Sequence, residues 1–158
     1  MSQSDVQKVV VLGSTGSIGC QTLDVLQYHS QYYKVFALVA KSNVDLMFEQ
    51  CQLFEPEFVV LVDETAALQL KKRLQGCGFS TEVLCGSSSV EQVAAAPEVD
   101  VVVAGIVGGA GLASTFAAVK ASKRLLLANK EALIMAGDLL MREVKRSGAE
   151  LLPVDSEH

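Results

Sequence analysis

Short apolar runs alternate with longer stretches of helical periodicity along all 158 residues of the chain. Such apolar runs are typical of strands that are buried on both faces of a parallel sheet. Right-handed crossovers between the strands place helices on both faces of that sheet, so the alternation predicts an α/β fold with a doubly wound parallel sheet. The expected strands are Lys8–Leu12, Lys34–Val39, Phe58–Leu61, Glu82–Leu84, Val101–Ala104, Arg124–Leu127 and Glu150–Leu152, and the expected helices are Ser17–Tyr28, Val44–Phe54, Glu64–Gln75, Ser89–Ala95, Ala110–Ala121 and Glu131–Ser147.

Composition and charge argue against several classes of protein. Half of the residues are hydrophobic and a fifth are charged, as in ordinary globular domains. No apolar run approaches the roughly 18 residues that a membrane span needs. The net charge of −5 argues against nucleic-acid binding, which depends on a basic surface. Lys71, Lys72 and Arg73 lie inside an amphipathic helical pattern, and we interpret them as a solvated face.

The cysteines and the N-terminus bear on compartment. Cys20, Cys51, Cys77 and Cys85 form no CxxC pair, and only two histidines are present, which argues against a zinc site. We interpret the cysteines as reduced thiols that are mostly small core residues. The first strand is expected almost at once, so no signal or transit peptide is predicted, and we expect a bacterial cytoplasmic protein.

A glycine-rich turn joins the first expected strand to the first expected helix. Gly13 permits the tight turn, Gly16 lets the backbone approach a phosphate, and Gly19 lets the helix pack on the sheet. The N–H groups at the start of the helix then meet the anion. The order of strand, turn and helix favours a Rossmann-like dinucleotide site over a plain tight turn. No Gly-Lys-Ser/Thr follows the turn, which argues against an NTPase.

The end of the second expected strand indicates which dinucleotide binds. NAD-binding proteins place an acidic residue there to hold the ribose 2′-hydroxyl. This chain has no acid at that point and continues with Lys41, Ser42 and Asn43. Since a cation suits a 2′-phosphate, the sequence predicts NADP(H) over NAD(H). The alternative is that Lys41 is only a surface charge.

Two further segments follow later strands. The glycines of residues 104–111 follow a strand that we expect beside the first one. Their backbone could approach the cofactor, or they could simply provide the small residues that the start of a helix needs. Asn129 and Glu131 suit a helix cap and a first helical turn. Lys130 is unfavourable near a helix N-terminus, and instead suits a phosphate or an anionic intermediate.

The last expected strand is followed by Asp155, Ser156, Glu157 and His158. Residues two apart in an extended segment point to the same side, so Asp155 and Glu157 could converge on Mg²⁺ or Mn²⁺. A solvated acidic tail is the alternative. Because an α/β active site begins at such a strand end, we expect residues 1–150 to form the cofactor domain and 151–158 to begin a truncated catalytic domain.

Three segments closely resemble the 1-deoxy-D-xylulose 5-phosphate reductoisomerase family: Leu12–Gly19, 129–131 and Leu152–His158. The resemblance implies rearrangement of 1-deoxyxylulose 5-phosphate and its reduction with NADPH to 2-C-methylerythritol 4-phosphate, in the non-mevalonate isoprenoid pathway. It also implies roles for individual residues. Thr15, Gly16, Ser17, Ile18, Asn43, Asn129 and Glu131 would contact NADPH, Lys130 and Ser156 the phosphosugar substrate, and Asp155 and Glu157 the metal, with Lys130 and Glu157 in catalysis.

The chain departs from the family at one point, where many members have a glycine, a basic residue and an asparagine. Here Lys41, Ser42 and Asn43 put the cation one position early, so that Ser42 could instead donate a hydrogen bond to the 2′-phosphate.

The resemblance further implies a third metal carboxylate, a C-terminal domain and a homodimer in the full-length protein. We therefore expect the chain alone to bind NADPH weakly and to turn nothing over. Another NADP-dependent reductase with a catalytic cysteine, or a nucleotide-sensing module, are the alternatives.

Overall fold

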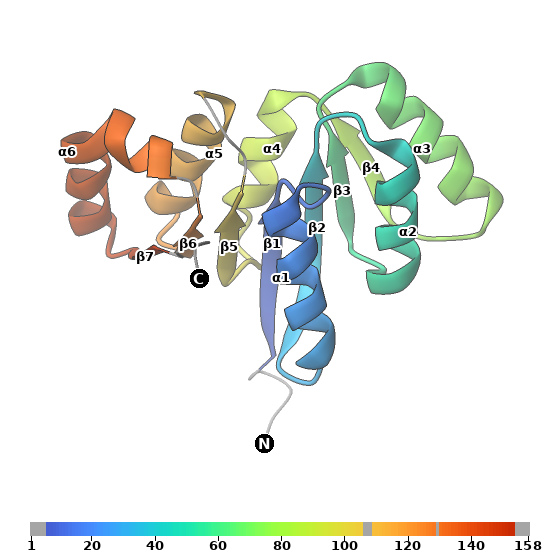
Figure 1. Cartoon of the computed structure of the whole chain (residues 1–158), viewed down its shortest axis with the longest axis horizontal. Helices are drawn as coiled ribbons and strands as arrows, with labels where there is room; N and C mark the ends of the chain where they lie inside the picture. Colours follow the sequence, from blue (N-terminus) through green and yellow to red (C-terminus); the bar gives the residue numbers. More distant parts are fainter. Residues whose placement is uncertain (1–5, 106–108, 129, 154–158) are drawn as a thin grey trace.

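The computed structural model describes residues 6–105, 109–128 and 130–153, which form a seven-stranded parallel sheet with three helices on each face (Figure 1). The strands are β1 (Gln7–Leu12), β2 (Tyr33–Ala40), β3 (Phe58–Leu61), β4 (Glu82–Cys85), β5 (Val101–Ala104), β6 (Arg124–Leu127) and β7 (Glu150–Pro153). The helices are α1 (Ser17–Tyr28), α2 (Val44–Phe54), α3 (Glu64–Gly76), α4 (Ser87–Ala94), α5 (Gly109–Lys120) and α6 (Lys130–Ser147).

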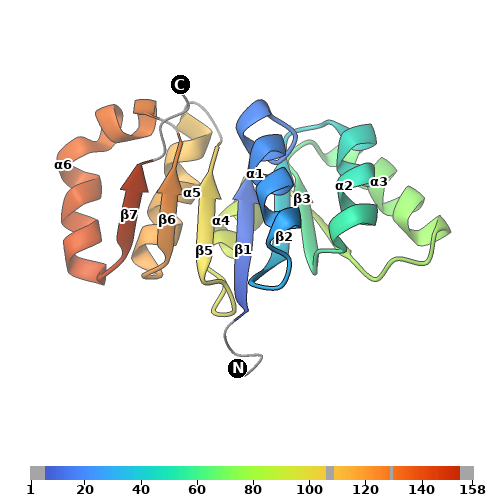
Figure 2. The ribbon, with the colours of Figure 1, turned by 60° about the horizontal axis from the view of Figure 1, so that its bottom comes forward.

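The strands lie in the order β4-β3-β2-β1-β5-β6-β7, and every neighbouring pair is parallel (Figure 2). The chain first adds β2, β3 and β4 on one side of β1. It then returns through α4 and adds β5, β6 and β7 on the other side. The direction of winding therefore reverses between β1 and β5, which is the point where ligands bind in open α/β sheets. The predicted doubly wound parallel sheet, with the fifth strand beside the first, is confirmed.

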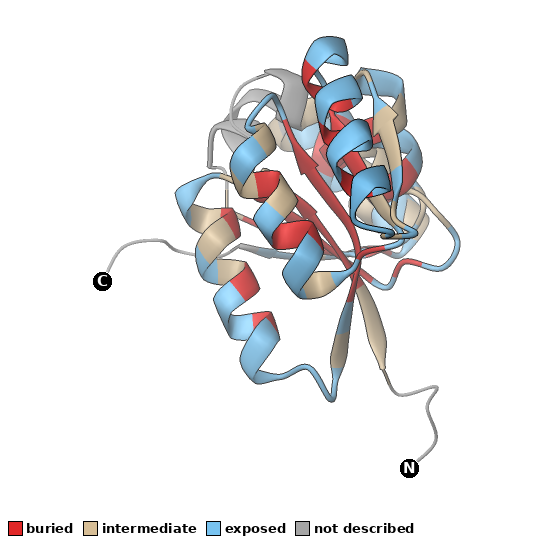
Figure 3. Cartoon of the chain, turned by 90° about the vertical axis from the view of Figure 1, so that its right-hand side faces the viewer, coloured by how far each residue is buried: buried red, intermediate tan, exposed pale blue. Residues whose placement is uncertain are grey.

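Each strand contributes side chains to two cores, one on either face of the sheet. In β1, Val9 and Val11 pack with α1, α2 and α3, whereas Val10 and Leu12 pack with α4, α5 and α6. Successive side chains of a strand point to opposite faces, which explains why a strand between two helix layers is apolar at every position. Figure 3 shows the buried strands between helices whose outer sides are exposed. Within the described residues, no helix is long and apolar enough to cross a membrane.

Two details differ from the expectations. Within α6, Gly137 has non-helical backbone angles (φ 17°, ψ −97°), so the single predicted helix consists of two segments joined at a kink. The cysteines are not mostly core residues: Cys51 is buried, but Cys77 and Cys85 are exposed. Cys77 lies directly after α3 and Cys85 ends the edge strand β4, where little covers either thiol. Burial raises the pKa of Cys51 to about 12, so that this thiol stays protonated at neutral pH.

We expect Lys123 to make the chain more stable at alkaline pH. Lys123 is 8% exposed, and its Nζ donates a hydrogen bond to the Val99 carbonyl oxygen at 2.7 Å. Burial lowers the pKa of Lys123 below 10.5, although the negative charges of Asp100 and Glu98 oppose the shift. The unfolded chain therefore holds more protons than the folded chain between the lowered pKa and 10.5, so the free energy of unfolding rises with pH across that window.

Urea unfolding of the wild type and of Lys123→Met from pH 8 to pH 10.5 tests this expectation. The contribution of Lys123 is present only in the wild type, whose free energy of unfolding should rise relative to that of the variant as the pH increases. Parallel curves for the two proteins would contradict it.

Candidate nucleotide-binding site

The glycine-rich turn between β1 and α1 lies between the ends of two neighbouring strands. The backbone N–H groups of Gly13 and Ser14 both donate to the carbonyl oxygen of Val39 in β2, at 2.8 and 2.9 Å. On the other side, the N–H of Gly105 donates to the carbonyl oxygen of Leu12 at 2.9 Å. The turn is thus held at the carboxyl edge of the sheet, at the reversal point between β1 and β5.

The structure explains the three glycines of the turn separately. Gly13 has φ +85°, which side chains disfavour. A Cβ atom on Gly19 would overlap the carbonyl oxygen of Gly13 and lie only 2.6 Å from the Cα of Ser14, so Gly19 lets α1 pack closely on the turn. Gly16 is exposed with φ −80°, and a Cβ there would meet the Gly13 oxygen at an ordinary 3.5 Å. Packing within the protein therefore does not require Gly16, which suits a backbone position that a ligand approaches.

The N-terminus of α1 differs from those of the next two helices. The side chain of Asn43 caps α2 by accepting from the N–H of Leu46 at 3.1 Å, and Asp63 caps α3 by accepting from the N–H of Thr65 at 2.9 Å. Helix α1 begins after Gly16 and has no side-chain cap and no acidic residue in its first turn. Its first N–H groups and the positive end of its dipole can therefore serve an anion.

A buried polar contact supports the turn from behind. The side-chain amide of Gln50, in α2, donates through Nε2 to the carbonyl oxygen of Ser14 at 2.9 Å. Gln50 is 6% exposed and Ser14 is fully buried, with its hydroxyl donating weakly to the sulfur of Met47 at 3.7 Å. In the described part of the chain, the other amide oxygen, Gln50 Oε1, has no hydrogen-bond partner. The sequence pattern does not predict this contact; its one signal is that Gln50 is the polar residue on the buried side of α2, beside Met47 and Cys51.

The segment after β2 runs beside the turn. Lys41, Ser42 and Asn43 are all exposed, and the N–H of Asp63 donates to the carbonyl oxygen of Lys41 at 2.9 Å, which ties this segment to the start of α3. The side-chain oxygen of Asn43 is engaged as the cap of α2. Ser42 and Asn43 also line a cavity of about 590 Å³ between α2 and α3. Its remaining lining residues are Val44, Asp45, Gln69, Lys72 and Arg73.

The structure brings the predicted cofactor residues of the glycine turn and of the segment after β2 together at one edge of the sheet. On the α5 side of that edge, a Cβ atom on Gly105 would lie 3.1 Å from the Leu12 carbonyl oxygen and 3.6 Å from the side chain of Ile18. Ile18 therefore lies between the turn after β1 and the segment after β5. Thr15 is half-buried, whereas Ser17 is exposed.

The remaining predicted residues are only partly described. Lys130 and Glu131 begin α6 directly after β6, which places their backbone at the same edge of the sheet. Asn129, Asp155, Ser156 and Glu157 lie outside the described residues. Among the residues that are described, no group of three or more His, Cys, Asp and Glu side chains could hold a metal ion. The acidic metal site therefore stays a prediction.

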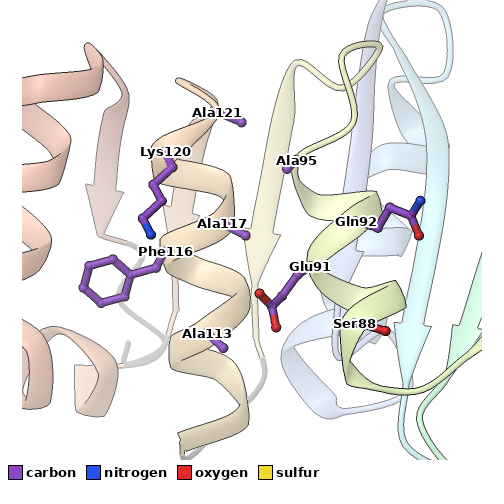
Figure 4. Close-up of a pocket in the computed structure, with 9 residues that line it drawn as sticks. All are labelled: Ser88, Glu91, Gln92, Ala95, Ala113, Phe116, Ala117, Lys120 and Ala121. Atoms are coloured by element: carbon purple, nitrogen blue, oxygen red, sulfur yellow. The ribbon is translucent and has the colours of Figure 1, made fainter.

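A second cavity lies apart from this edge, in the groove between α4 and α5 (Figure 4). It measures about 820 Å³, and its lining includes Glu91 of α4, Phe116 and Lys120 of α5, and alanines of α5 and of the residues that directly follow the two helices. None of its lining residues belongs to the segments after β1 and β2. The nucleotide site that the sequence predicts is therefore not this larger groove.

Residues 9–137 match the family described as 1-deoxy-D-xylulose 5-phosphate reductoisomerase. A curated relative of that name from Glaesserella parasuis serovar 5 is 53% identical over 153 residues, which make up 97% of this chain and 39% of the relative. The chain thus spans well under half of the length of such relatives.

Solved structures agree with the sequence match. A crystal structure of DOX-P reductoisomerase in complex with NADPH, fosmidomycin and magnesium superposes with a TM-score of 0.91 at 42% identity, over 96% of this chain and 37% of that one. The 1-deoxy-D-xylulose 5-phosphate reductoisomerase from Zymomonas mobilis in complex with NADPH superposes with a TM-score of 0.90 at 38% identity, over 97% of this chain and 40% of that one.

Proposed function

The chain belongs to the 1-deoxy-D-xylulose 5-phosphate reductoisomerase family, and on that premise we propose that it forms the NADPH-binding part of such an enzyme. In this proposal the sheet through β7 and its helices bind NADPH, and the residues that follow β7 begin the part that binds metal and substrate. The whole protein would convert 1-deoxyxylulose 5-phosphate to 2-C-methylerythritol 4-phosphate in the cytoplasm of a bacterium, as a homodimer in isoprenoid biosynthesis. The family match favours this activity over that of another NADP-dependent reductase.

The observation that carries the proposal is the geometry of the glycine turn. Gly13 and Gly19 provide the tight turn and the close helix, and Gly16 exposes backbone beside the uncapped N-terminus of α1. The pyrophosphate of NADPH would accept hydrogen bonds from the N–H groups of Ser17 and Ile18. Its adenosine ribose would lie toward Ser42, and its nicotinamide toward the segments after β5 and β6. When bound, NADPH supplies the hydride for the reduction.

The substrate and the metal would bind on the nicotinamide side of the reversal point. We propose that Lys130 and Ser156 bind the phosphosugar, because a lysine suits an anionic substrate or intermediate. Asp155 and Glu157 would hold Mg²⁺ or Mn²⁺, whose charge favours the electron-rich oxygens that form during the rearrangement. A solved relative at 42% identity contains NADPH, fosmidomycin and magnesium, which supports a whole protein that takes a metal ion and a small ligand as well as the dinucleotide.

Isothermal titration of the chain with NADPH and with NADH tests the proposal. We expect NADPH to bind at least about tenfold more tightly, since charge-assisted contacts to a phosphate contribute about 1.5–3 kcal/mol. We also expect no NADPH oxidation when substrate and Mg²⁺ are added to the chain alone. Equal or tighter binding of NADH would refute the cofactor assignment, and measurable oxidation would refute the expected inactivity.

A further inference from the structure

We propose that the 2′-phosphate of NADPH is bound by Lys72 of α3 together with Ser42, in the cavity between α2 and α3. This inference rests on the proposed NADPH function and adds a specificity-determining residue to it. By sequence pattern alone, Lys72 is expected on a solvated face, and Lys41 is the cation expected at the 2′-phosphate. The structure instead places Lys72 on the wall of a cavity that Ser42 also lines.

The cavity lies where the 2′-phosphate is expected in this fold. A dinucleotide whose pyrophosphate sits at α1 directs its adenosine ribose to the end of the second strand. That strand is β2, which ends at Ala40. The glycine turn lies beside this strand end, because the N–H of Gly13 donates a hydrogen bond to the carbonyl oxygen of Val39. Two residues further along the chain, Ser42 opens into the cavity, which measures about 590 Å³ and has room for a phosphate group.

The charges around the cavity favour an anion. Arg73 forms an ion pair with Asp45, with 2.7 Å between Nη1 and Oδ1, and its guanidinium lies 4.2 Å from the centre of the Phe48 ring. That pair neutralises the acidic residue of the cavity wall and holds Arg73 in place. Lys72 forms no ion pair with any residue that the structure describes, so the wall carries a net charge of +1 from these three side chains.

The chemistry of a phosphate monoester suits this arrangement. A 2′-phosphate is close to doubly charged at neutral pH and accepts several hydrogen bonds. The ammonium group of Lys72 can turn toward it as a flexible point charge, and the hydroxyl of Ser42 can donate a hydrogen bond from the other wall. In this chain, a cation from a helix thus takes the place of a cation in the loop after β2.

Lys71 provides a matched control, because it has the same charge, lies one residue away on the same helix and is not among the cavity-lining residues. We expect Lys72→Ala to weaken NADPH binding about tenfold and to leave NADH binding unchanged, by titration calorimetry. Lys71→Ala should leave both affinities within about twofold of the wild type. Both substitutions are at exposed positions, where stability changes little, so the thermal melts of both variants should match that of the wild type.

Two further measurements sharpen the test. The loss in Lys72→Ala should recur with 2′,5′-ADP as the probe and be absent with 5′-AMP, which has no 2′-phosphate. Adding Ser42→Lys to Lys72→Ala should restore NADPH affinity, because it returns a cation to the same cavity. NADPH preference that survives Lys72→Ala, or a double variant that stays weak, would overturn the assignment of Lys72 and leave the proposed function standing. A wild-type chain without NADPH preference would overturn both.

Discussion

Replacement of Gly19 by alanine is expected to lower the free energy of unfolding by about 3 kcal/mol, the upper end of the usual cost of overpacking, and to abolish NADPH binding. The new Cβ would overlap the carbonyl oxygen of Gly13 and lie 2.6 and 2.8 Å from the Cα and carbonyl carbon of Ser14. These are backbone atoms of a turn that two hydrogen bonds hold to β2, so they cannot yield as the end of a side chain could. Helix α1 would have to move away from the sheet, taking the phosphate-binding N–H groups with it.

Two other glycines serve as controls for this substitution. Gly76, at the end of α3, has open space where a Cβ would go, so Gly76→Ala should leave stability unchanged or raise it by up to about 1 kcal/mol. Gly16→Ala makes only an ordinary contact, so it should change stability little but weaken NADPH binding. Urea unfolding and NADPH titration of the three variants separate these effects. A Gly19→Ala protein as stable as Gly76→Ala would disprove the packing argument.

The fold could be predicted from the sequence because two local signals agree. Residues 9–12 are apolar at every position since each neighbour faces a different helix layer, and that pattern is typical of a sheet covered on both faces. The glycines at 13, 16 and 19 then fix where the first strand stops and the first helix starts. The kink at Gly137 could not be predicted, because an isolated glycine within a helical pattern is as consistent with a straight helix.

The candidate site could be predicted only where its residues are close in sequence. The turn after β1 is one continuous segment, so its spacing carries the signal. The contact between Gln50 and Ser14 joins residues 36 positions apart, and helical periodicity shows that Gln50 is buried without showing what it faces. Lys71 and Lys72 cannot be distinguished by composition or charge. Only the packing of α3 against α2 places Lys72 on a cavity.

We expect Gln50→Glu to produce a pH-dependent loss of both stability and NADPH binding. The wild-type amide donates to the Ser14 carbonyl oxygen at 2.9 Å, and this geometry fixes which end of the amide carries the nitrogen. A carboxylate at that position would place a negative charge against a carbonyl oxygen in a site that is 6% exposed. The folded chain would therefore favour the protonated acid, whose O–H can donate to Ser14, and the pKa of the glutamate would rise well above its usual value of about 4.3.

The sign of the effect follows from that shift. Between the pKa of the glutamate in the unfolded chain and its raised pKa in the folded chain, the folded chain holds one more proton than the unfolded chain. The free energy of unfolding therefore falls as the pH rises through this range, and it reaches its lowest level above the raised pKa. At pH 8.5 the variant should be about 3–5 kcal/mol less stable than the wild type, with a smaller deficit at pH 5.5.

Gln50→Met, which leaves the Ser14 oxygen without this donor but adds no charge, should cost about 1–3 kcal/mol at both pH values. Urea unfolding and NADPH titration at the two pH values compare the variants. If Gln50→Glu lost NADPH affinity equally at both, the turn would not depend on the proton at position 50, and Gln50 would fill space behind the turn without positioning it.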